Sequence, residues 1–145
     1  MRRLVLALLA AALAARSQHI QYLTLNEGVL EERLRLAHPK NSERYKRLKE
    51  LFATSGCKDD LLQEQKVGGS KEPNMRCAIA GTAEHPRKII VGAHFDSIGG
   101  DGVIDNWSGS ILLPTLYQFT KVGPRRHAFE VFHCPGFWPV RQPLP

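Results

Sequence analysis

The stretch KIIVGAHFDS, residues 88–97, decides the fold class of this chain of 145 residues. Its apolar, partly β-branched first half is typical of a strand that is covered on both faces. A Gly-rich loop follows, and the apolar residues 106–120 then predict a helix that Pro114 kinks or delays. Residues 127–132 predict another strand. The order strand, helix, strand predicts a right-handed parallel crossover, and therefore an α/β fold.

Two helices and two strands are predicted before this stretch. Residues 25–39 have apolar side chains at helical spacing, and Pro39 ends that segment. A second helix is capped by Asn41 or Ser42 and ends at Gly56. The charged residues between these signals are interpreted as a solvated face. We therefore expect a mixed, mainly parallel sheet flanked by helices, with further strands at residues 61–67 and 75–80.

The two ends of the chain differ from its middle. Residues 1–15 contain Arg2 and Arg3 followed by an apolar run, which predicts a secretory signal peptide. That run is too short to cross a bilayer, so we expect a secreted or periplasmic protein with no stable membrane span after signal removal. Residues 134–145 are rich in proline and predict an irregular tail. The domain itself is assigned to residues 16–133.

Charge and cysteine content narrow the function classes. The formal net charge is +6, but much of it lies in the leader and after residue 120, which argues against nucleic acid as a partner. In an exported protein Cys57 and Cys77 either form a disulfide or remain two buried thiols, and Cys134 is the third cysteine. The sequence has no Cys-x-x-Cys pair, so a thiolate metal site is not supported.

Candidate functional residues gather directly after the apolar strand. His94 ends the strand and Asp96 follows two residues later, where it can orient the imidazole. Asp105 lies at the start of the next helix, and the glycines between them allow the loop to bend back. Ligands bind at the carboxyl ends of strands in such sheets, and imidazole with carboxylates suits Zn²⁺.

The motifs KIIVGAHFDS and DNWSG, joined by a Gly-rich loop and followed by an apolar helix, resemble one family. It is the co-catalytic zinc exopeptidases of the bacterial leucyl aminopeptidase or aminopeptidase Y type, and the match covers roughly residues 40–129. The resemblance implies a zinc exopeptidase fold of the phosphorylase/hydrolase-like type. It also implies a peptide substrate, whose N-terminal bond is attacked by water that two zinc ions activate.

Carried over to this sequence, the resemblance implies that His94 binds one zinc ion and that Asp105 bridges two. Asp96 would be the catalytic carboxylate that orients the histidine. The bond between Asp105 and Asn106 is a candidate for the cis form. Residues that bind the substrate side chain remain unknown.

The family's later ligands are absent at the expected place. A Glu-Glu pair is expected near residues 137–138, yet no acidic residue follows Glu130. Glu130 and His133 are not expected to substitute, because residues three apart on a strand point to opposite faces. We therefore expect an incomplete, inactive fragment, truncated after about the fourth strand, with weak or absent zinc binding. A shifted reading frame is one hypothesis for the changed composition.

Two alternatives remain open. The first is a catalytically silent module that binds peptides in the same cleft. The second is a single-zinc acyl-transfer or cyclase relative on the same fold. Side-chain specificity, the choice between amino- and carboxypeptidase, and the oligomeric state are left open by the sequence.

Overall fold

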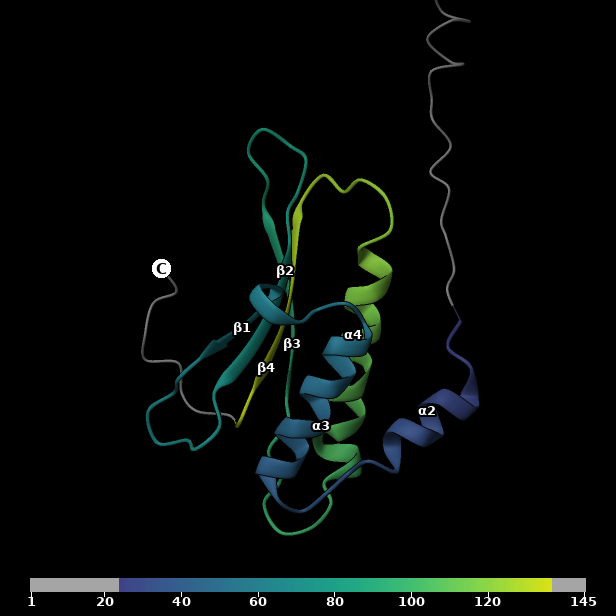
Figure 1. Cartoon of the computed structure of the whole chain (residues 1–145), viewed down its shortest axis with the longest axis vertical. Coiled ribbons are helices and arrows are strands. Elements are labelled where there is room, and N and C mark those ends of the chain that lie inside the picture. Colours follow the sequence, from purple (N-terminus) through teal and green to yellow (C-terminus); the bar gives the residue numbers. More distant parts are fainter. Residues whose placement is uncertain (1–23, 137–145) are drawn as a thin grey trace, which may run out of the picture.

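A four-stranded mixed sheet with helices packed on one face forms the fold (Figure 1). The computed structural model describes residues 24–136, so the predicted signal peptide and most of the predicted tail lie outside the described residues. The helices are α2 (Glu27–Leu34), α3 (Asn41–Thr54) and α4 (Ser108–Thr120), with short helical turns η1 (Asp59–Leu61) and η2 (Val103–Trp107). The strands are β1 (Leu62–Gln65), β2 (Asn74–Ile79), β3 (Lys88–His94) and β4 (Ala128–Cys134).

The strand order is β1-β2-β4-β3, which confirms the predicted mixed α/β class. Strands β3 and β4 are parallel and α4 connects them, as the crossover rule predicts. The expectation of a mainly parallel sheet was wrong for the described residues, because β1 pairs antiparallel with β2 and β2 pairs antiparallel with β4. The short connection from β1 to β2 forces a hairpin, and only the segment between β3 and β4 holds a crossover helix.

The start of α3 differs from the prediction. Lys40 occupies the N-cap position and makes no side-chain capping bond. Asn41 is the first helical residue, and its side-chain oxygen accepts a hydrogen bond from the backbone N–H of Ser97 at 2.9 Å. One of the two predicted capping residues, Asn41, is therefore used for a long-range contact, which holds the loop after β3 against α3.

Two buried clusters lie between the sheet and the helices. One contains Phe52, Tyr117 and Val131 around the disulfide that joins Cys57 to Cys77. The second cluster consists of Leu48, Met75, Phe95, Trp107 and Ile111. The disulfide connects the segment that directly follows α3 to the middle of β2, so it links the helical layer to the sheet.

Pro114 lies inside α4, which continues from Ser108 to Thr120. A proline has no N–H to offer the carbonyl four residues earlier, which here belongs to Ser110. That carbonyl instead accepts a hydrogen bond from Nε2 of His133 at 2.9 Å. The buried histidine on β4 thereby satisfies a carbonyl that the proline leaves open.

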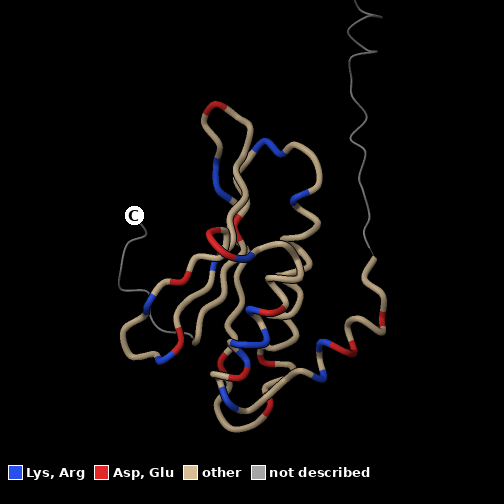
Figure 2. The backbone as a smooth tube through the Cα atoms, viewed as in Figure 1, with Lys and Arg blue, Asp and Glu red and all other residues tan. Residues whose placement is uncertain are grey.

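The edge strand β3 leaves apolar residues partly exposed, with Ile89 at 48% and Ile90 at 47% of full accessibility. Over the described residues, basic and acidic residues alternate along the backbone without a long run of one sign (Figure 2). Within residues 24–136 no helix is long and apolar enough to cross a bilayer.

Candidate metal-binding site

The predicted site residues meet at the carboxyl end of β3. His94 is the last residue of that strand, Asp96 follows it, and Asp105 lies in η2. Together with Ser97, Ile98 and two loop glycines they line a pocket of about 240 Å³. The structure therefore brings together the three side chains that the sequence analysis selected.

The imidazole of His94 lies between two carboxylates. Its Nδ1 is 2.8 Å from Oδ1 of Asp96, and its Nε2 is 3.0 Å from Oδ1 of Asp105. A neutral imidazole carries one N–H, so it can donate to only one of these oxygens. Which of the two oxygens receives that proton depends on the tautomer of the ring. This arrangement suits a cation held by one nitrogen and one oxygen, with Asp96 orienting the ring.

The loop between the ligands closes tightly. Gly102 has a φ of 51°, and a Cβ placed on it would lie 2.7 Å from Oγ of Ser97 and 2.8 Å from the carbonyl oxygen of Asp105. A side chain at this position would therefore push the two halves of the loop apart. The Asp105–Asn106 peptide bond is cis, as the resemblance implied.

Arg44 is a residue of this region that the sequence analysis assigned to a solvated face. That assignment was wrong, because the side chain is fully buried beneath the loop. Burial lowers the pKa of its guanidinium, while the carboxylates of Asp96, Asp101 and Asp105 oppose the shift. Helical spacing did not single it out, since a charged residue on an amphipathic helix is most often exposed.

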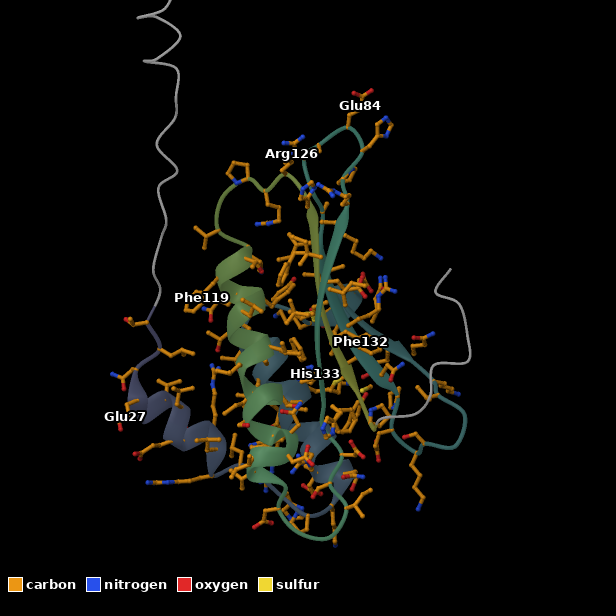
Figure 3. The ribbon with its side chains drawn as sticks, turned by 180° about the vertical axis from the view of Figure 1, so that it is seen from behind. Glu27, Glu84, Phe119, Arg126, Phe132 and His133 are labelled. Carbon is orange, nitrogen blue, oxygen red and sulfur yellow. A yellow bond between two sulfur atoms is a disulfide. The ribbon has the colours of Figure 1, made fainter. Side chains whose placement is uncertain are left out.

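Glu130 and His133 lie away from the pocket, as expected. Glu130 faces the side of the sheet opposite the helices, where its carboxylate is 3.8 Å from Arg76 and 3.2 Å from Lys88. His133 points toward α4, and Figure 3 shows it on the other side of β4 from Phe132. Neither residue lines the pocket.

Cys134 ends β4 beside His94 in the parallel register. Its thiol is unpaired in the described structure, and burial is the main cause that raises the pKa of the thiol. A raised pKa disfavours the thiolate, which is the form that binds metals.

The side chains at this site are of types that bind zinc, but there are fewer of them than a catalytic zinc site uses. An imidazole nitrogen and a carboxylate oxygen face one another, and both are ordinary zinc ligands. Catalytic zinc sites use three protein ligands, however, and residues 24–136 contain no group of three or more His, Cys, Asp or Glu placed to hold a metal ion. The described residues fit one side of a coordination sphere, which His94 and Asp105 would occupy.

Comparison of the fold with solved structures finds clear likenesses. The Legionella pneumophila LapA aminopeptidase is 17% identical with a TM-score of 0.53, and the match covers 83% of this chain and 41% of that one. A Fimbriiglobus ruber glutaminyl cyclase is 16% identical with a TM-score of 0.57, covering 84% and 50%. A Staphylococcus aureus tripeptidase is 15% identical with a TM-score of 0.53, covering 75% and 36%.

No protein-family model matches the sequence, and no curated protein matches it either. The chain spans half or less of the length of the three solved structures described above. At these identities the likeness concerns the fold. The chain therefore has the α/β fold found in an aminopeptidase, a tripeptidase and a glutaminyl cyclase.

Proposed function

We propose that this chain forms part of an exported zinc exopeptidase domain of the leucyl aminopeptidase type. In this proposal it holds one zinc ion weakly through His94 and Asp105 and does not hydrolyse peptides by itself. The observation that carries the proposal is the position of His94 between the carboxylates of Asp96 and Asp105. Shared fold with an aminopeptidase and a tripeptidase adds support.

Each residue has a separate role in the proposed site. Nε2 of His94 and an oxygen of Asp105 would contact the ion, which when bound supplies a Lewis acid for a carbonyl or a water. Asp96 would keep the proton of the ring on Nδ1, so that Nε2 presents its lone pair. No further carboxylate lines the pocket in residues 24–136, so a general base for water is missing there. This is the reason that we propose binding without turnover.

Export is proposed from two features. The leader pattern predicts secretion, and the buried Cys57–Cys77 disulfide is of the kind that persists in oxidising compartments. Zinc and peptides in those compartments would then be the partners of the pocket.

His94→Ala is expected to weaken zinc binding at least tenfold, because it removes the nitrogen ligand and leaves Asp105 alone. Isothermal titration of the full chain with zinc measures the affinity, and His85→Ala is the matched control because His85 lies exposed on a distant turn. A leucyl chromogenic peptide should be hydrolysed no faster than in buffer with zinc. Equal zinc affinity in both variants would refute the site, and hydrolysis abolished by His94→Ala would refute the inactivity.

A peptide-binding role without hydrolysis is a second candidate. The pocket combines the carboxylates of Asp96 and Asp105 with Ile98, which is 97% exposed. Such a set suits an α-ammonium group beside an apolar side chain. Binding of a leucyl peptide in the presence of a chelator, weakened by Asp105→Asn, would favour this role over the zinc site.

A further inference from the structure

The buried guanidinium of Arg44 is bonded to the loop that carries the proposed ligands. The side chain has no exposed surface and lies over the ring of Trp107, 4.9 Å from its centroid. Nε donates to the carbonyl of Phe95, and Nη1 donates to the carbonyl of Asp101. Nη2 donates to the carbonyl of Gly102 at 3.4 Å. Burying a charge is costly, and here backbone carbonyls compensate the cost.

These carbonyls lie on both sides of the site. Phe95 stands between His94 and Asp96, while Asp101 and Gly102 precede Asp105 along the chain. A single planar group with its donors in a rigid fork therefore connects the two ends of the loop.

Other bonds hold the same loop, one of them internal and two to its surroundings. The side chain of Asn41, in the first turn of α3, accepts from the N–H of Ser97 at 2.9 Å. The backbone N–H of Trp107 donates to the carbonyl of Gly102 at 3.0 Å. The indole of Trp107 donates to the carbonyl of Arg33 at 2.9 Å. The loop is thus clamped on α3 and α2, with Arg44 at its centre.

Asp105 depends on this clamp for its position. Its side chain is 88% exposed, whereas that of His94 is 21% exposed. Apart from its contact with His94, this exposed side chain is held by the backbone that carries it. The distance between Nε2 of His94 and Oδ1 of Asp105 is therefore set by where the loop is fastened.

We propose that Arg44 is a positioning residue, which fixes Asp105 opposite His94 and so builds the cation site before any ion arrives. The positive charge also offsets the carboxylates of Asp96, Asp101 and Asp105, which would otherwise repel one another. The inference rests on the proposed function only in taking His94 and Asp105 as the ligand pair.

The test compares three variants of the full chain. Arg44→Met keeps the length of the side chain but removes every donor, and Arg44→Lys keeps the charge without the fork. Arg47→Met is the matched control, because Arg47 on the same helix donates to the carbonyl of Leu36, away from the loop. Zinc affinity, the absorption spectrum of bound cobalt and hydrogen exchange of the loop amides are measured where each variant is fully folded by circular dichroism.

Arg44→Met should bind zinc at least tenfold more weakly, with a changed cobalt spectrum and faster exchange at Ser97 and Trp107. Arg44→Lys should be intermediate, and Arg47→Met should match the wild type. Wild-type affinity and wild-type loop exchange in folded Arg44→Met would overturn the inference. So would equal losses in Arg44→Met and Arg47→Met, because they would indicate a general structural effect.

The experiment also distinguishes failure of the proposed function from failure of this inference. If the wild type and His94→Ala both fail to bind zinc, the proposed function fails. Hydrogen exchange of the loop amides then tests the role of Arg44. Protection that is retained in Arg44→Met would overturn this role, and a loss of protection confined to the loop would support it. If Arg44→Met does not fold, Asn41→Ala replaces it, because this change removes one bond of the clamp. Unchanged affinity and loop exchange in Asn41→Ala would overturn the inference.

Discussion

Reduction of the Cys57–Cys77 disulfide is expected to lower the free energy of unfolding by about 3 kcal/mol. The two cysteines are 20 residues apart, so the bond closes a loop that restricts the unfolded chain. Both residues are fully buried beside Phe52 and Val131, and after reduction the two sulfur atoms only need to move apart to van der Waals contact inside that cluster. The loss therefore comes mainly from the gain in freedom of the unfolded state. For a small domain it is a large part of the total stability.

Urea unfolding followed by tryptophan fluorescence, with and without reductant, measures this change. A loss of that size should move the midpoint by roughly 2 M urea. Cys134→Ser is the control, because its unpaired thiol should contribute nothing to the difference between the oxidised and reduced protein. An unchanged midpoint, in protein shown by a thiol assay to be reduced, would contradict the prediction.

Acid is expected to destabilise the fold through His133. The ring is fully buried, and burial lowers its pKa to about 4 from the ordinary value of 6.5. Nε2 donates to the carbonyl of Ser110, so an added proton would reside on Nδ1, which has no hydrogen-bond partner in the described structure. The unfolded chain takes up this proton first as the pH falls below 6.5. Stability from this group is therefore complete above pH 6.5 and is lost on the way to pH 4.

The expected slope is about 1.4 kcal/mol per pH unit in that window, or about 3 kcal/mol in total. Chemical unfolding at a series of pH values measures it. His133→Leu should be less stable at pH 7.5 by about 1–2 kcal/mol, because the carbonyl of Ser110 loses its donor. The stability of this variant should fall less steeply as the pH decreases, because its unfolding takes up one proton fewer. His85→Ala is the control with an exposed ring, and a wild-type slope in His133→Leu would show that another group is responsible.

Local patterns were sufficient to predict the elements around the site. The apolar run of β3, the glycine loop and the apolar α4 follow one another closely in sequence, so their order predicted the parallel crossover. His94, Asp96 and Asp105 lie within a dozen residues, and their meeting at one strand end follows from that short connection.

Pairing between strands that are distant in sequence could not be predicted in the same way. The pairing of β2 with β4 joins residues about fifty positions apart, and the alternation of side chains along a strand does not specify the direction of its neighbour. For this reason the sheet was expected to be mainly parallel, and the structure shows two antiparallel pairings among the described strands.

By itself, the sequence determined which segments become strands and helices near the site. The spacing of apolar residues and the positions of glycines influence backbone conformation over only a few residues, so these effects can be recognised locally. The tertiary structure alone decided the burial of Arg44, the use of Asn41 by the loop, and the bond from His133 to the carbonyl that Pro114 leaves open. Each of these polar groups is satisfied by a backbone group from a distant segment. The sequence around a polar residue does not indicate whether its hydrogen bonds will be made to water or to such a distant group.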